Sequence, residues 1–253
     1  ATDGKVKKYL SDRNRANEYK KLSVKEGAYY DGLIEIDLAK VEPMIALPFH
    51  PSNVYKISEL LANPYEILSE CEKKGRELLK NDKFSLTDKI TADGKIKVDQ
   101  VCIGSCTNSS LLDMMKVAAI LKGKTVHPAV SLSIAPGSKQ VLNMISQNGA
   151  LSDMIDAGAR ILESACGPCI GMGQSPKSAG VSLRTFNRNF EGRSGTADGQ
   201  VYLVSPETAA ISAITGVLTD ATTLTDDISI QLPKTFIIND NMIEMPAETP
   251  EEA

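Results

Sequence analysis

The stretch KVDQVCIGSCTNSSLLDMMKVAAILKGK, residues 97–124, decides the fold class. Residues 97–104 contain the apolar run VCI at 101–103 and end in glycine, which is typical of a buried strand, and residues 111–124 have apolar positions at helical spacing. The polar cluster NSS at residues 108–110 offers the side-chain oxygen that caps a helix N-terminus. The stretch therefore predicts a strand that is followed directly by a helix.

The same pattern continues through the rest of the chain. Further short apolar runs predict strands at residues 129–135, 159–163, 181–186 and 201–204. The segments between and after them predict helices at residues 138–149, 151–158 and 205–220. Because strands that alternate with helices form parallel sheets, we predict an α/β fold with three layers, α/β/α, around a mostly parallel sheet.

Two elements are predicted upstream of this region. Apolar side chains recur through residues 33–38, which indicates a short strand followed by a proline-rich connection. Residues 64–80 have helical apolar spacing, and Cys71 lies on the apolar side of this helix. There we expect it to be buried as a small hydrophobic side chain.

The composition limits the class of protein. Of 253 residues, 28 are Lys or Arg and 32 are Asp or Glu, so the net charge is −4, and we expect no nucleic-acid partner. No apolar run approaches the roughly 18 residues of a membrane span, so we expect no membrane partner. The charged start of the chain lacks a signal-peptide core and the five cysteines are an odd number, which predicts a cytoplasmic protein without a disulfide framework. With only two histidines, sulfur chemistry is favoured over a multi-histidine metal site.

Chemistry-bearing residues follow three of the predicted strands. The carboxyl ends of parallel strands lie at one edge of a sheet, where open α/β folds bind ligands. The residues in the loops at this edge are Cys106, Cys166, Cys169, Asn187, Arg188 and Arg193. The topology therefore predicts that three thiols meet one amide and two guanidinium groups.

Three kinds of site could use these thiols. Cys106 is expected at a helix N-terminus, where the helix dipole lowers a thiol pKa and favours a metal-binding thiolate. The CGPC spacing of Cys166 and Cys169 also fits a redox pair, although a redox pair usually opens a helix and this one is followed by IGMG. A four-cysteine zinc site would need Cys102, which sits in an apolar strand run and more naturally packs in the core.

The third kind of site is an iron–sulfur cubane held by three cysteines. One iron of such a cluster has no protein ligand and acts as a Lewis acid toward oxygen ligands. Arg188 and Arg193 at the same edge could then bind substrate carboxylates, because the guanidinium fork matches carboxylate geometry.

Three segments are similar to the signature segments of the aconitase family, in the family's order. They are GSCTNSS at 104–110, ACGPCIG at 165–171 and NRNFEGRSG at 187–195. The resemblance implies that the three cysteines of these segments bind a 4Fe-4S cluster. It also implies that the asparagine and the two arginines of the third segment, Asn187, Arg188 and Arg193, bind the substrate.

The resemblance further implies the activity of an aconitate hydratase of the tricarboxylic acid cycle, which converts citrate to isocitrate through cis-aconitate. The alternatives are an isopropylmalate- or homoaconitate-type dehydratase large-subunit domain, or a structural four-cysteine zinc module. Because the family's acid–base groups lie in other domains, no catalytic residue is assigned within this chain.

We expect the chain to be a fragment of such an enzyme. Residues 29–225 would form the third, cluster-binding domain, and residues 1–28 the end of a preceding domain or a linker. Residues 226–253 would form an extension and a linker toward a missing swivelling domain. The partners would then be the missing domains of the same chain, and the fragment alone would have little activity.

Overall fold

The computed structural model describes residues 2–225, 228–239 and 241. The chain divides into two compact units, which are described separately. One comprises residues 41–231, and the other comprises residues 1–40 with the described part of 232–253. The smaller unit contains helix α1 (Gly4–Ser11) and two 3-10 turns, η1 (Ala16–Glu18) and η2 (Leu38–Lys40).

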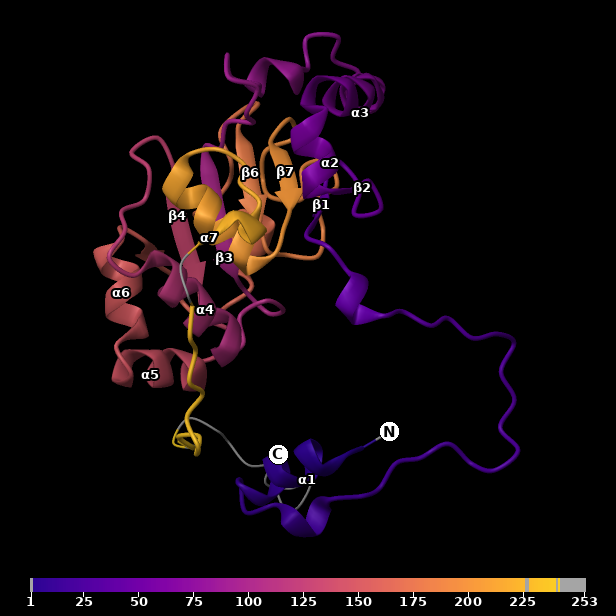
Figure 1. Cartoon of the computed structure of the whole chain (residues 1–253), viewed down its shortest axis with the longest axis vertical. Coiled ribbons are helices and arrows are strands. Elements are labelled where there is room, and N and C mark those ends of the chain that lie inside the picture. Colours follow the sequence, from indigo (N-terminus) through magenta and orange to yellow (C-terminus); the bar gives the residue numbers. More distant parts are fainter. Residues whose placement is uncertain (1, 226–227, 240, 242–253) are drawn as a thin grey trace, which may run out of the picture. The chain divides into compact units, whose positions relative to one another are not determined.

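A seven-stranded sheet is the centre of the larger unit, with the strand order β2-β1-β7-β6-β3-β4-β5 (Figure 1). The strands are β1 (Met44–Ala46), β2 (Val54–Lys56), β3 (Gln100–Gly104), β4 (Ser131–Ala135), β5 (Arg160–Ile161), β6 (Val181–Arg184) and β7 (Gln200–Leu203). Strands β3 to β7 pair in parallel, whereas β1 pairs antiparallel with β2 and β7. The prediction of an α/β fold around a mostly parallel sheet is confirmed.

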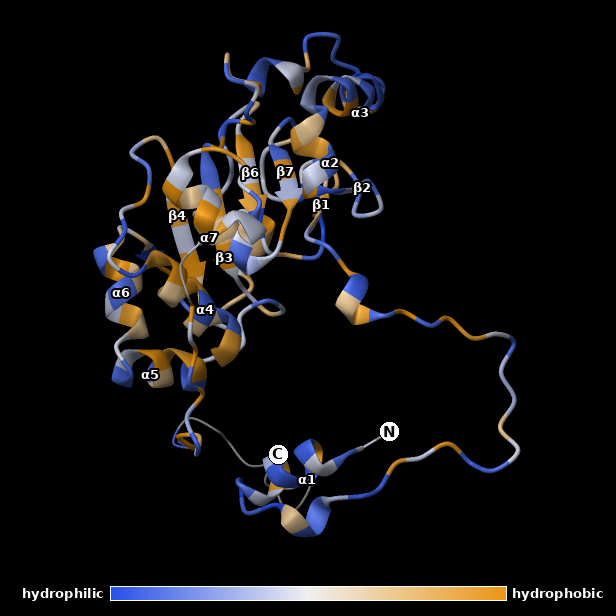
Figure 2. Ribbon diagram, in the orientation of Figure 1, coloured by the Kyte–Doolittle hydropathy of each residue, from blue (hydrophilic) through white to orange (hydrophobic). Residues whose placement is uncertain are grey.

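Helices connect most of these strands. They are α2 (Ile57–Ala62), α3 (Pro64–Leu79), α4 (Leu111–Leu121), α5 (Lys139–Gln147), α6 (Ala150–Asp156) and α7 (Pro206–Thr215), with 3-10 turns η3 (Thr87–Lys89), η4 (Gly167–Ile170) and η5 (Ala221–Thr223). Helix α4 packs on α6 and α7, and α7 packs on β3. In Figure 2, hydrophobic and hydrophilic residues both occur along α5, as expected of a helix that covers a core with one side.

The helix starts follow from the sequence. The Ser110 hydroxyl accepts a hydrogen bond from the Asp113 amide, and the Asp113 carboxylate accepts one from the Ser110 amide, which forms a capping box for α4. The Ser205 hydroxyl caps α7 by accepting a hydrogen bond from the Thr208 amide, and Pro206 occupies the first helical position. None of the helices in the described part of the chain is long and apolar enough to span a membrane.

The sheet has one point where the order of the strands reverses. From β3 the chain steps outward to β4 and β5, then returns across the sheet to β6 and β7 on the other side of β3. Connections between parallel strands are right-handed. The connections that lead from β3 toward β5 therefore lie on one face of the sheet, and the connection from β6 to β7 lies on the other. Strands β3 and β6 are neighbours, so the gap between their carboxyl ends is the topological switch point.

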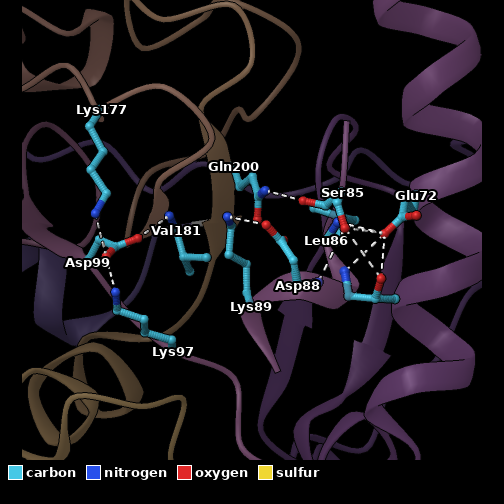
Figure 3. A network of polar contacts seen from close by, with 11 residues as sticks. Glu72, Ser85, Leu86, Asp88, Lys89, Lys97, Asp99, Lys177, Val181 and Gln200 are labelled. Carbon is cyan, nitrogen blue, oxygen red and sulfur yellow. Dashed lines mark hydrogen bonds and ion pairs between the residues drawn. The ribbon is translucent and has the colours of Figure 1, made fainter. Parts of the chain in front are cut away.

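A polar network fixes the segment between α3 and β3 (Figure 3). The buried Glu72 carboxylate accepts hydrogen bonds from the Ser85 hydroxyl and from the amides of Leu86 and Thr87. The Ser85 carbonyl in turn accepts a hydrogen bond from the Gln200 side chain of β7, with a distance of 2.6 Å. These contacts hold the segment against the sheet, although the segment does not add a strand to it.

One expectation about the first part of the chain differs from the structure. The strand predicted at residues 33–38 is wrong: the segment has no regular structure before η2, and Leu33 and Ile34 are each 88% exposed. The expected domain bounds, 29–225, stay a prediction, and most of the expected linker at 226–253 lies outside the described residues. Strands β1 and β2 were not predicted, because three-residue strands are too short to show a periodic pattern.

Candidate functional site

A cavity of about 170 Å³ lies at the switch point of the sheet. Its lining residues are Gly104, Ser105, Cys106, Thr107, Cys166, Cys169, Phe186, Asn187, Arg188 and Arg193. The structure therefore brings all six predicted site residues to one cavity, although they are spread over three loops. Their roles as cluster ligands and substrate-binding groups stay predictions.

The loop after β3 turns sharply to present Cys106. Gly104 has a φ of +109°, and a Cβ atom there would lie 2.0 Å from the carbonyl oxygen of Ala135, so only glycine fits. Ser105 follows in the left-handed region, with a φ of +69°, and its side chain is buried. Cys106 is exposed at the mouth of this turn.

The expected reason for a reactive Cys106 is wrong. The thiol lies four residues before the N-cap Ser110, so it is not at the N-terminus of α4. A hydrogen bond with the Thr107 hydroxyl nevertheless lowers the pKa of Cys106 below its ordinary value. A neighbouring side chain, not the helix dipole, therefore favours the thiolate.

The CGPC segment forms a tight turn on the sheet. Cys166 precedes η4, and Gly171 ends this 3-10 turn in the left-handed region with a φ of +88°. A Cβ atom at Gly171 would lie 2.1 Å from the carbonyl oxygen of Ser194, so this glycine lets the second and third signature segments touch. No α-helix follows the pair directly in the described structure, which weakens the thioredoxin-like alternative.

Cys169 is the buried member of the pair. It packs with Cys102 and Phe186 in a small hydrophobic cluster. Burial raises the pKa of Cys169, while the nearby positive charge of Arg193 acts in the opposite direction. The Arg193 Nη2 atom donates a hydrogen bond to the Cys169 sulfur at 3.5 Å, which joins a thiol and a guanidinium group at the wall of the cavity.

Two asparagines hold the first part of the loop after β6. The Asn187 amide donates a hydrogen bond to the Thr107 hydroxyl at 2.9 Å, which ties this loop to the loop after β3. Asn189 is fully buried and donates to the carbonyl oxygens of Leu47 and Val201 at 2.8 and 3.2 Å. The sequence analysis did not single out Asn189, although it lies within the third signature segment.

Two buried polar atoms of residues that line the cavity lack a protein partner in the described part of the chain: Ser105 Oγ and Arg193 Nε. Ser164 Oγ and Ser194 Oγ, in the loops after β5 and β6, also lack one there. A buried polar atom without a hydrogen bond costs about 1–3 kcal/mol, so such atoms are expected where a ligand supplies the missing partner. The two atoms at the cavity fit a site for a polar or anionic group.

The four-cysteine zinc alternative does not fit this geometry. Cys102 is 1% exposed, and its sulfur accepts a hydrogen bond from Ser133 within the sheet. Among the residues that the structure describes, no group of three or more His, Cys, Asp or Glu side chains is arranged to bind a single metal ion. A cubane differs in that each thiolate binds a separate iron, so its ligands need not converge on one point. The donor set at the cavity therefore fits a three-cysteine cluster better than zinc.

Comparison with known proteins identifies the family. A family model described as "Aconitase family (aconitate hydratase)" matches residues 1–216. The chain belongs to the aconitase family. It is a domain of a hydro-lyase family whose members bind 4Fe-4S clusters.

Several similar curated proteins carry the same name, 3-isopropylmalate dehydratase large subunit. A 3-isopropylmalate dehydratase large subunit 1 from Thermotoga maritima is 34% identical over 220 residues, which is 87% of this chain and 45% of the relative. The large subunits from Sulfurimonas denitrificans and Caldanaerobacter subterraneus subsp. tengcongensis are 36% and 37% identical, over 87% and 83% of this chain. The chain thus spans about half the length of these relatives. Their names agree with the alternative drawn from the sequence better than with its main reading as an aconitate hydratase.

Proposed function

We propose that this chain carries the cluster and the carboxylate-binding arginines of a hydro-lyase that acts on 3-isopropylmalate. The observation that carries this proposal is the single cavity at the switch point, which three thiols and two guanidinium groups line together. The relatives support 3-isopropylmalate over citrate, because the three named above are all 3-isopropylmalate dehydratases.

Cys106, Cys166 and Cys169 would hold the 4Fe-4S cluster. When bound, the cluster supplies an iron without a protein ligand, which acts as a Lewis acid toward a hydroxyl or carboxylate oxygen. Two of the three thiols are exposed at the cavity mouth and the third is buried in its wall, so the group would be held from one side and stay accessible from the other.

The arginines orient the substrate. Arg188 is exposed at the cavity, and the half-buried Arg193 contacts Cys169 with one nitrogen while its Nε has no partner in the described structure. Two forked cations at one cavity suit a substrate with two carboxylates. Asn187 is held in place by its hydrogen bond to Thr107, and its amide lies at the same cavity as the two arginines and is offered to the substrate.

The proton-transfer groups come from elsewhere. No carboxylate, imidazole or amine is among the residues that line the described cavity. The relatives are about twice as long as the matched region and are named large subunits. We therefore expect the rest of a large subunit and a smaller partner chain to complete the site, and the present chain to have little turnover by itself.

Electron paramagnetic resonance (EPR) tests this proposal. The chain is loaded anaerobically with iron and sulfide, reduced, and mixed in turn with 3-isopropylmalate, citrate and homocitrate. We expect 3-isopropylmalate to change the cluster signal at a lower concentration than the other two acids, and the variant Arg193→Lys to weaken this response. A signal that responds to citrate alone would favour aconitate hydratase, which the family model's description names.

A further inference from the structure

Arg184 in β6 is a fully buried cation, and the described part of the chain gives it no acidic partner. Its side chain is 0% exposed, and in the described part of the chain no carboxylate lies within ion-pair distance of it. All of its hydrogen-bond acceptors are neutral. A guanidinium group stays protonated even when burial lowers its pKa, so the charge must be stabilised by its surroundings.

Two of the four acceptors belong to the turn at residues 168–174, which starts within the CGPC segment. Nη1 donates to the carbonyl oxygen of Pro168 at 2.6 Å, and Nη2 donates to the carbonyl oxygen of Gln174. The other two acceptors lie on the sheet: the Gln100 side-chain oxygen and the Ser182 hydroxyl, each at 3.0 Å. One guanidinium group therefore joins both ends of the 168–174 turn to strands β3 and β6.

The charge lies behind the wall of the cavity. Arg184 is the register partner of Cys102, and Cys102 packs with Cys169 and Phe186. The Phe186 ring, which lines the cavity, has its centroid 5.6 Å from the Arg184 guanidinium carbon. Cys169 and Phe186 therefore face the cavity and also belong to the side-chain cluster next to the cation.

We propose that Arg184 is a positioning residue of the cluster site: it holds the turn that carries Cys169, and its buried positive charge stabilises an anionic group bound in the cavity. A buried charge with only neutral partners is costly, and a negative group nearby in a medium of low dielectric constant offsets that cost. This inference rests on the proposed function, since the anionic group is the cluster with its thiolates.

Two variants separate the two roles. Arg184→Met keeps the volume but removes the charge and all four hydrogen bonds. Gln100→Glu keeps an oxygen acceptor beside Nη2 and places a carboxylate against the guanidinium, so the charge is neutralised while the contacts of Arg184 to Pro168 and Gln174 remain. It removes one weaker bond, from the Gln100 amide to the Gln174 carbonyl oxygen at 3.4 Å. Arg160→Met, at an exposed position on β5, is the matched control for losing an arginine from the sheet.

The holding role is measured without a cluster. In the apo chain, Arg184→Met is expected to speed hydrogen exchange at the amides of Gly171 and Gln174 by about tenfold or more, because carbonyl groups of the turn lose a charge-assisted bond. Arg160→Met should leave these amides as protected as in the unchanged chain. Gln100→Glu loses only the weaker bond to Gln174, so it should change the exchange rates much less than Arg184→Met does. Equal protection of the turn in Arg184→Met would overturn the holding role, even if the chain binds no cluster.

The charge is measured on the loaded chain. Both Arg184→Met and Gln100→Glu are expected to lower the cluster reduction potential, because reduction adds negative charge that the cation stabilises, whereas Arg160→Met should leave it unchanged. An unchanged potential in Gln100→Glu would overturn the electrostatic role. Failure of the unchanged chain to bind a cluster would count against the proposed function and the electrostatic role together, while the exchange experiment still decides the holding role.

Discussion

Replacing Gly104 with alanine should disrupt the turn that presents Cys106. Two terms add at this position. A non-glycine residue at a φ of +109° costs about 1–2 kcal/mol, and the new Cβ would lie 2.0 Å from the backbone oxygen of Ala135, which cannot move without displacing β4. An overpacked site of this kind costs about another 1–3 kcal/mol, so we expect a loss of roughly 2–5 kcal/mol in the free energy of unfolding.

Gly123 provides the matched control. Its φ is +67°, but a Cβ atom there would meet nothing within 4 Å. Gly123→Ala should therefore lose only the conformational term, about 1 kcal/mol. Thermal and urea unfolding followed by circular dichroism measure both variants, and a domain of this size loses about 2–4 °C in Tm per kcal/mol. Equal losses in the two variants would refute the reasoning, because the clash with Ala135 would then contribute nothing.

Three further outcomes are expected. In urea titrations, Asn189→Ala should lower the free energy of unfolding by about 2–3 kcal/mol, because buried carbonyl groups lose their donor. Asn187→Ala, at an exposed position, should lower it by less than about 1 kcal/mol. Burial alone would raise the pKa of Glu72, but the bonds from the 85–87 segment (Figure 3) outweigh it and hold the pKa below 4.5. The stability that this depressed pKa provides is therefore present at neutral pH and is lost as pH falls through the folded-state pKa. Glu72→Gln removes this contribution, so a plot of the free energy of unfolding against pH should fall less steeply at acid pH. An unchanged slope there would contradict this. In the cluster-free chain, iodoacetamide should modify the exposed Cys106 well before Cys71, because burial raises the pKa of Cys71 to about 11. Mass spectrometry shows which cysteine is modified first, and modification of Cys71 before Cys106 would contradict the prediction.

The sequence predicted the part of the fold that positions the site. The strand predicted at 97–104 and the capped helix after it occur as β3 and α4. Strands β4, β5 and β6 fall within their predicted ranges, and β7 begins one residue before its range. This succeeded because buried parallel strands and capped helices leave strong local patterns. The convergence of the loops then followed from topology.

Other features depend on tertiary contacts that no local pattern reports. Apolar spacing at 33–38 indicated a strand, but a strand also needs a pairing partner, and the structure gives this segment none. An arginine within the run VSLRTF shows no sign of complete burial, yet Arg184 is enclosed by a turn that lies ten residues upstream along the chain. The lowered pKa of Cys106 likewise comes first from a hydrogen bond with Thr107 that no local sequence pattern reports.

Iron and sulfide analysis of the anaerobically loaded chain tests the central claim most directly. If three cysteines hold the cluster, the chain should bind about four irons and four sulfides, and should lose them in Cys106→Ser, Cys166→Ser and Cys169→Ser. The variants Cys71→Ser and Cys102→Ser should bind as much iron as the unchanged chain. One zinc ion per chain, bound equally through Cys102 and the three cavity cysteines, would contradict the account.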